Sequence, residues 1–242
     1  MKIITTELGE GDKVAVLVHG VFTDNRTWRR VGPALAERGY RVVSVDLGGH
    51  GQSPRSAQYS IEGLGQDVLD SVPARPDLLI GHSLGALVAS KIVDRLDPQR
   101  VIYEDPPFLD GKMPLRIRMF FGALNSPVYP ITAKRIAKLA PQWDQPDANN
   151  AVDAYGLYDR RVLKAVIAHP AWLETPTKMG RPSLVLVAQN DSVMGPVRGR
   201  LEALGFDFRV IPDTGHSVHL DNFDGFMAAT DDWLATSNFT RG

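Results

Sequence analysis

The sequence contains no cysteine among its 242 residues. This absence excludes disulfide frameworks, thiolate metal sites and a cysteine nucleophile. Long apolar runs are also missing, since no uninterrupted stretch approaches the roughly 18 residues that a membrane-spanning helix needs. We therefore expect no stable membrane insertion.

An excess of charge of either sign is missing as well. The chain carries 27 Lys and Arg against 28 Asp and Glu, which gives a formal net charge of −1. Such a balance produces no field that attracts nucleic acid, so we expect no nucleic-acid partner. Residues 1–13 lack the apolar core and small-residue cleavage site of a secretory signal, which favours a cytoplasmic protein. No pattern indicates the oligomeric state.

Short apolar runs recur along the chain and alternate with helix-like stretches. Runs this short are typical of strands that are buried on both faces of a parallel sheet. The expected strands are 14–18, 41–45, 78–80, 101–103, 183–188 and 206–211, with one extra strand at 2–7. The expected helices are 27–38, 61–71, 84–96, 197–204 and 223–235. This alternation predicts an α/β protein with a doubly wound, mostly parallel sheet.

The alternation stops between residues 108 and 181, where the chain is helix-like and has no clear strand. We predict a small helical cap, or lid, inserted after the strand near residue 104. The core then consists of residues 1–107 and 182–242, and the cap of residues 108–181. A cap in this position would cover the carboxyl edge of the sheet, where ligands bind in open α/β proteins.

The segment Gly81-His82-Ser83-Leu84-Gly85 places G-x-S-x-G between an expected strand and an expected helix. A serine on a sharp strand-to-helix turn stands clear of the sheet, as a nucleophile must. The flanking glycines avoid collisions where the backbone folds back. A plain glycine-rich turn would explain the spacing too, but the strand-turn-helix context favours a nucleophilic Ser83.

A second loop, His19-Gly20-Val21-Phe22, follows the first strand of the alternation directly. Acyl transfer needs two hydrogen-bond donors for the oxyanion, and one of them comes from a loop after an early strand. We expect the backbone N–H groups of Val21 and Leu84 to form this oxyanion hole. The alternative is an ordinary strand-to-loop turn.

With these segments the chain resembles the α/β-hydrolase superfamily, in the form of a serine-nucleophile esterase or lipase. The loop from Asp46 to Ser53 (DLGGHGQS) is similar to the D-x-x-G-H-G-x-S signature of that superfamily. The resemblance covers nearly all of the chain outside the cap. It implies that His50 braces this loop rather than acting in catalysis.

The superfamily order is nucleophile, acid, base, and the resemblance implies Asp191 as the acid and His216 as the base. Glu104 or Asp105 is an alternative acid, because some members carry the acid after that earlier strand. His219 is an alternative base, although it fits better as a brace. His216 and His219 form an H-x-x-H pair, but the sequence offers no evident third metal ligand, so we expect no metal.

These residues predict a serine hydrolase that cleaves a carboxylic ester or related acyl bond through an acyl-enzyme and needs no cofactor. The expected partner is a small, apolar acyl substrate. A C–C bond hydrolase, a lactonase or a cofactor-free perhydrolase would carry the same triad. A ligand-sensing protein with slow turnover also remains open.

The expected cap is rich in apolar and basic residues. Between residues 112 and 142 there are six Lys or Arg and no Asp or Glu. A solvated helix face explains this pattern, and so does an anionic substrate, an acyl-carrier partner or a membrane surface. Met113, Met119, Phe120 and Phe121 fit either an apolar pocket or ordinary core.

Overall fold

The computed structural model describes residues 1–111, 113–126, 131–189 and 195–236. Its sheet has seven strands in the order β1-β3-β2-β4-β5-β6-β7, and every neighbouring pair is parallel except β1 and β3. The strands are β1 Thr5–Leu8, β2 Lys13–Val18, β3 Tyr40–Val45, β4 Leu78–His82, β5 Arg100–Glu104, β6 Ser183–Ala188 and β7 Asp207–Ile211. The prediction of a mostly parallel α/β sheet is confirmed.

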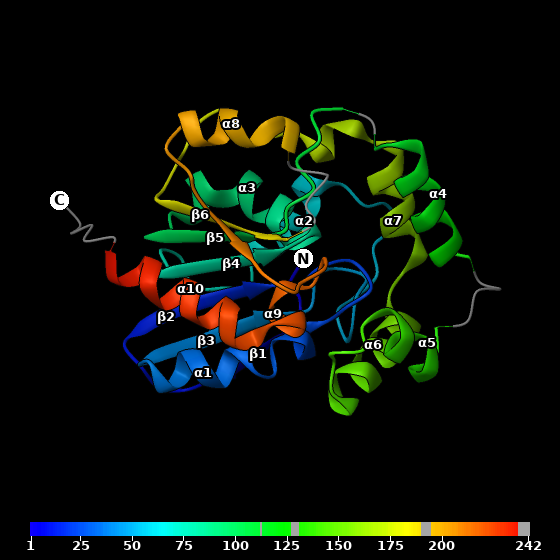
Figure 1. The fold of residues 1–242 in the computed structure, drawn as a ribbon, viewed down its shortest axis with the longest axis horizontal. Helices are drawn as coiled ribbons and strands as arrows, with labels where there is room; N and C mark the ends of the chain where they lie inside the picture. Colours follow the sequence, from blue (N-terminus) through cyan, green and yellow to red (C-terminus); the bar gives the residue numbers. More distant parts are fainter. Residues whose placement is uncertain (112, 127–130, 190–194, 237–242) are drawn as a thin grey trace.

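Helices cover both faces of this sheet (Figure 1). One face carries α2 (Ile61–Leu69), α3 (Leu84–Leu96) and α8 (Gly195–Ala203), and the other carries α1 (Val31–Glu37), α9 (Val218–Asp221) and α10 (Phe223–Thr236). Along β2, Val16 and Val18 belong to the core layer under α2, α3 and α8, whereas Ala15 and Leu17 belong to the layer under α1, α9 and α10. Successive strand residues point to opposite faces, so a fully apolar strand fills both layers.

The stretch 27–38, which we expected to be one helix, is divided into a 3₁₀ turn, η1 (Asn25–Trp28), and helix α1. Pro33 explains the division. A continuous helix would need the N–H of residue 33 to bond the carbonyl of Arg29, and proline has no N–H. The prediction of a single helix there was wrong.

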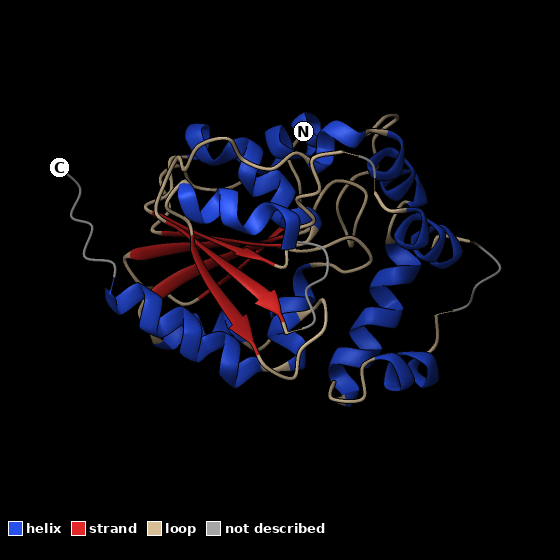
Figure 2. Ribbon diagram, turned by 45° about the horizontal axis from the view of Figure 1, so that its top comes forward, coloured by secondary structure: helices blue, strands red, loops and turns tan. Residues whose placement is uncertain are grey.

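Residues 108–181, here called the cap segment, contribute only helices in their described part. They are α4 (Leu115–Leu124), α5 (Ala133–Leu139), α6 (Gln145–Leu157), α7 (Arg160–Ala168) and the 3₁₀ turn η2 (Pro170–Leu173). These helices gather beyond the carboxyl ends of the parallel strands (Figure 2). Val162, Leu163 and Val166 of α7 join the core layer that contains α3. The exact division into a core and a cap stays a prediction.

Candidate active site

Ser83 occupies the turn between β4 and α3 with φ 51° and ψ −112°. This left-handed conformation is strained for a residue with a side chain. The neighbouring backbone leaves no room for other side chains. A Cβ on Gly85 would lie 2.1 Å from the carbonyl oxygen of Val18, and one on Gly81 would lie 2.5 Å from that of Gly85. The turn therefore requires glycine on both sides of Ser83.

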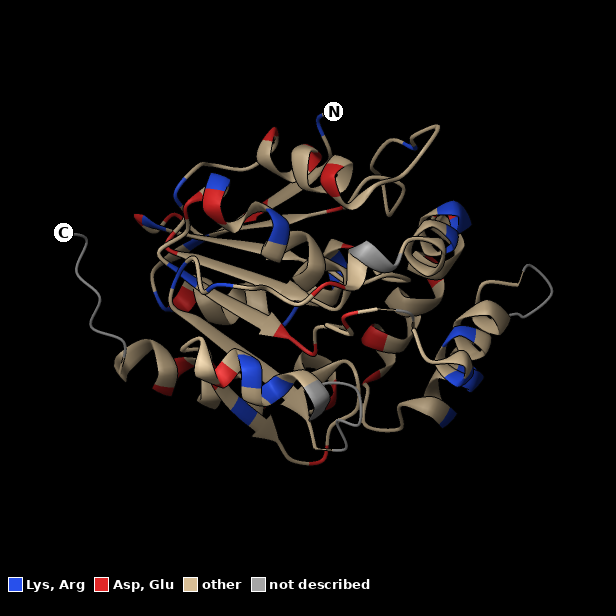
Figure 3. Ribbon diagram, turned by 90° about the horizontal axis from the view of Figure 1, so that it is seen from above, with Lys and Arg blue, Asp and Glu red and all other residues tan. Residues whose placement is uncertain are grey.

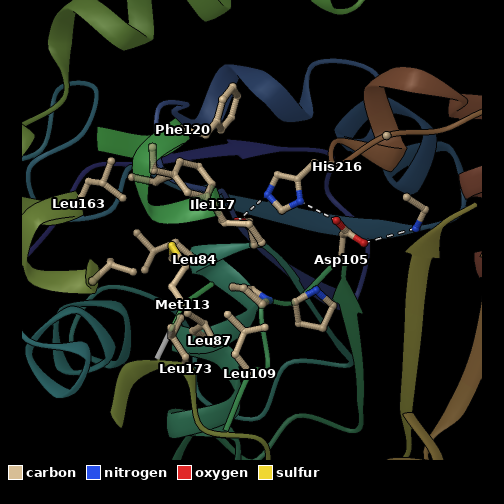
Figure 4. A pocket seen from close by; sticks show the side chains of 18 of the residues that line it. Leu84, Leu87, Asp105, Leu109, Met113, Ile117, Phe120, Leu163, Leu173 and His216 are labelled. Carbon is tan, nitrogen blue, oxygen red and sulfur yellow. Dashed lines mark hydrogen bonds and ion pairs between the residues drawn. The ribbon is translucent and has the colours of Figure 1, made fainter. Parts of the chain in front are cut away.

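His216 lies in the loop after β7 and contacts both Ser83 and Asp105. Its Nε2 is 2.8 Å from Oγ of Ser83, and its Nδ1 is 2.5 Å from Oδ2 of Asp105 (Figure 4). Asp105 directly follows β5, so the three side chains come from the ends of three strands. A hydroxyl, an imidazole and a carboxylate in this sequence of contacts can pass the hydroxyl proton to the imidazole.

The acid expected from the family order, Asp191, lies outside the described residues. The carboxylate that contacts His216 belongs to Asp105, one of the two alternatives named from the sequence. Its second oxygen accepts a 3.4 Å hydrogen bond from the N–H of Ala188, at the end of β6. The only signal in the sequence was the position of Glu104 and Asp105 immediately after a buried strand.

The pKa of His216 is raised above its ordinary value of 6.5. Burial by the surrounding atoms lowers this pKa, but the hydrogen bond and charge of Asp105, together with Glu104 and Asp221, outweigh it. The side chain is nevertheless 47 % exposed, toward the cavity in front of Ser83. The arrangement stabilises an imidazolium at the place where a proton would arrive from Ser83.

The second carboxylate, Glu104, pairs with His219 in the core. Glu104 is 0 % and His219 is 1 % exposed, and Nδ1 of His219 lies 2.7 Å from Oε1 of Glu104. The other ring nitrogen of His219 is 2.8 Å from the hydroxyl of Thr27, and its ring stacks on Trp28 at 4.4 Å. Burial raises the pKa of Glu104, but its electrostatic interactions with His219 and His82 and the hydrogen bonds from His219 lower it overall. His219 is thus enclosed and holds no contact with Ser83 in the described structure.

His82, which the sequence analysis did not single out, supports the loop that carries His216. Burial lowers the pKa of His82 to about 4, so its ring is neutral at pH 7. Its Nε2 lies 2.8 Å from the carbonyl oxygen of His216 and donates to it. The residue before Ser83 therefore fixes the backbone of the residue that contacts Ser83.

The loop with Gly20 and Val21 passes beside Ser83. A Cβ on Gly20 would lie 3.3 Å from Cβ of Ser83, and Val21 lines the same cavity as Ser83 and Leu84. Leu84 is the first residue of α3, so its N–H has no acceptor within the helix. The oxyanion role of Val21 and Leu84 stays a prediction.

The loop from Asp46 to Ser53 is held by buried polar contacts. Asp46 accepts hydrogen bonds from the N–H groups of Asn25 at 2.8 Å and Gln52 at 2.9 Å. His50 is 0 % exposed and stacks on Tyr158 at 6.0 Å, and burial lowers its pKa to about 3. A buried neutral ring enclosed in this way fits the bracing role that the resemblance implies for His50.

Two apolar cavities meet at Ser83 and His216, with volumes of about 350 Å³ and about 170 Å³. Both are lined by Val21, Ser83, Phe121 and His216. The larger cavity is otherwise lined mainly by apolar side chains from α3, α4, α7 and the segment just before α4 (Figure 4); they include Leu84, Leu87, Met113, Ile117, Phe120 and Leu163. The smaller one lies between α4, α5 and α6; its lining includes Leu124, Ile136, Leu139, Trp143 and Tyr155.

Comparison with known proteins identifies the family. The alpha/beta hydrolase family model matches residues 15–229, so the chain belongs to the alpha/beta hydrolase family. The prediction of that membership is confirmed. Among solved structures, the N-formylmaleamic acid deformylase of Pseudomonas putida S16 superimposes with a TM-score of 0.76 at 20 % identity, covering 94 % of this chain and 96 % of that one. At this identity the likeness concerns the fold.

Two curated relatives are similar in sequence. A pimeloyl-[acyl-carrier protein] methyl ester esterase of Methylococcus capsulatus is 44 % identical over 81 residues, which are 34 % of this chain and 31 % of that protein. An sn-1-specific diacylglycerol lipase of Mus musculus is 27 % identical over 255 residues, covering 91 % of this chain and 80 % of that protein. The first match thus spans about a third of the relative, whereas the second is nearly complete.

Proposed function

We propose that this protein is a serine hydrolase that cleaves carboxylic esters through an acyl-enzyme, with Ser83 as nucleophile, His216 as base and Asp105 as acid. The observation that carries the proposal is the pair of contacts on His216, 2.8 Å to Ser83 Oγ and 2.5 Å to Asp105 Oδ2. The two relatives named above act on ester bonds, which supports the same reaction class. A cytoplasmic location belongs to this proposal as well.

The reaction begins when Ser83 Oγ attacks the acyl carbon and Nε2 of His216 takes the hydroxyl proton. Asp105 holds the proton on Nδ1, so that the lone pair of Nε2 faces Ser83, and it stabilises the imidazolium that forms. The N–H groups of Val21 and Leu84 bind the oxyanion. The imidazolium then protonates the leaving alcohol, and His216 activates a water that releases the acid.

The two cavities indicate the substrate class. Each is lined mainly by apolar side chains, and Ser83 lines both. An ester that carries an apolar group on both sides of its carbonyl fills both cavities at once. Burial of apolar surface in each cavity contributes to binding in proportion to the area removed from water.

The test is hydrolysis of p-nitrophenyl esters of increasing acyl length by wild type, Ser83→Ala and Ser90→Ala. We expect a turnover number of at least about 1 per second on the best ester. Ser83→Ala should lower kcat by a factor on the order of 10³ to 10⁶. Ser90, whose hydroxyl bonds the carbonyl of Leu87 on the same helix, is the matched control and should leave kcat unchanged. Equal activity of Ser83→Ala and wild type would refute the proposal.

A further inference from the structure

The four most exposed large apolar side chains of the described residues all lie on two helices of the cap segment. Leu115, Met119 and Phe120 of α4 are 63 %, 66 % and 53 % exposed, and Leu139 of α5 is 62 % exposed. The remaining large apolar side chains are 45 % exposed or less. Scattered single exposures need no explanation, but a concentration on neighbouring cap helices marks an interaction surface.

Basic side chains surround these apolar ones. Arg116 and Arg118 of α4 and Lys134 and Lys138 of α5 are exposed. Within the described residues none of the four forms an ion pair, although most of the other described arginines do. Figure 3 shows Lys and Arg gathered on α4 and α5 at one end of the molecule. We call these eight residues the docking face.

On α4 the exposed apolar side chains share one side of the helix, with basic side chains at its borders. Leu115 and Met119 are four residues apart and share one side of the helix, and Arg116 and Arg118 flank that side. The opposite side of α4 presents Ile117, which lines the larger cavity. The helix is therefore apolar on both sides, and Leu115 and Met119 on its outward side are left largely exposed.

Two residues of the docking face also line the cavities at Ser83. Phe120 is half exposed and lines the larger cavity, while Leu139 is exposed and lines the smaller one. An apolar molecule that leaves a lipid layer at these two residues can enter either cavity along an apolar path. The surface and the candidate active site are thus continuous.

We propose that the docking face binds the surface of an anionic lipid bilayer, with the apolar side chains inserted among the acyl chains and the basic ones against the headgroups. Protruding apolar residues bordered by Lys and Arg are the pattern that interfacial helices use. The binding is peripheral, since no helix among the described residues is long and apolar enough to cross a membrane. The proposal goes beyond ester hydrolysis, and its test needs no turnover.

The test is co-sedimentation of the full chain with vesicles of phosphatidylcholine, with and without phosphatidylglycerol. We expect binding that requires the anionic lipid and weakens as salt is added. Arg116→Glu with Arg118→Glu should weaken binding by more than roughly fivefold per charge. Leu115→Ser with Met119→Ser should weaken it by roughly tenfold or more per side chain.

The matched control is Lys13→Glu with Arg95→Glu, which changes the net charge equally. These residues lie at the start of β2 and near the end of α3, at the opposite edge of the sheet. The control should bind vesicles like wild type, and all variants should keep the wild-type circular dichroism spectrum. Absence of vesicle binding, or equal loss in the control, would overturn the proposal. So would capture of an acidic carrier protein, or self-association, that depends on Arg116 and Arg118 while vesicles do not bind.

Discussion

Glu104 and Asp105 are consecutive residues, yet their carboxylates bind two different histidines. Asp105 contacts His216 beside Ser83, and Glu104 contacts His219 in the core. Neighbouring residues at the end of a strand point to opposite sides, so one carboxylate faces the cavity and the other faces the interior. A carboxylate and a histidine therefore pair in two different settings here, one beside the hydroxyl of Ser83 and one in the buried core.

Replacing Asp105 by Asn should remove most of the activity. The amide still bonds to Nδ1 but favours the wrong tautomer of His216, and kcat should fall by a factor on the order of 10³ to 10⁴. The matched variant is Asp191→Asn, the acid expected from the family order, which should stay within a few-fold of wild type. Steady-state kinetics on one good ester compares the two. The opposite ranking would assign the acid to Asp191.

The pH dependence of kcat/KM should report the raised pKa of His216. The base must be neutral to accept a proton, so activity rises with pH through that pKa and reaches its midpoint above 6.5. In Asp105→Asn the carboxylate charge is gone while burial still lowers the pKa, so the midpoint should move to lower pH. Initial rates at subsaturating ester across about pH 5 to 9 measure both midpoints. An identical midpoint in the two proteins would contradict the coupling of Asp105 to His216.

Alanine variants of His216 and His219 should differ in which property they lose, activity in the first and stability in the second. His219→Ala removes the imidazole partner of the buried carboxylate of Glu104 and leaves it only the backbone N–H of residue 219, so we expect the free energy of unfolding to fall by about 3 kcal/mol. Where the variant is folded, its kcat/KM should remain within a few-fold of wild type. His216→Ala should remove most of the activity and leave the free energy of unfolding nearly unchanged, because the side chain is partly exposed and contacts Ser83.

Urea unfolding measures the free energy of unfolding of the two histidine variants, and ester kinetics measures their kcat/KM. A large loss of activity in folded His219→Ala would make that residue part of the reactive site. A large loss of stability in His216→Ala would show that the Asp105 contact serves packing instead.

A methyl group on Gly85 should destabilise the fold strongly. Its Cβ would lie 2.1 Å from the backbone carbonyl of Val18, an atom that cannot move without disturbing the sheet. We expect Gly85→Ala to lower the free energy of unfolding by at least about 3 kcal/mol. Gly122→Ala is the control, since that Cβ meets nothing within 4 Å. In the interior of α4 it should stabilise by about 0.5–1 kcal/mol. Thermal unfolding of both variants tests this contrast.

Much of the fold followed from local patterns. The helix predicted at 84–96 matches α3, and the run at 183–188 matches β6. Both are long or strongly apolar, so neighbouring residues alone favour one structure. The error at 27–38 arose because the apolar spacing continues across Pro33, whereas the backbone hydrogen bonds do not.

The candidate nucleophile was determined by the sequence itself, because G-x-S-x-G needs only a strand, a turn and a helix that are contiguous in the chain. Which carboxylate contacts His216 was decided only by the tertiary structure. Glu104 ends a buried strand, Asp105 follows it, and Asp191 comes soon after another in the chain, and spacing does not reveal where a carboxylate points. Asp105 and His216 are separated by 111 positions and meet only because β5, β6 and β7 lie side by side in the sheet. Side-chain direction at a strand end and the pairing of distant strands are properties of the folded chain, which a linear motif does not contain.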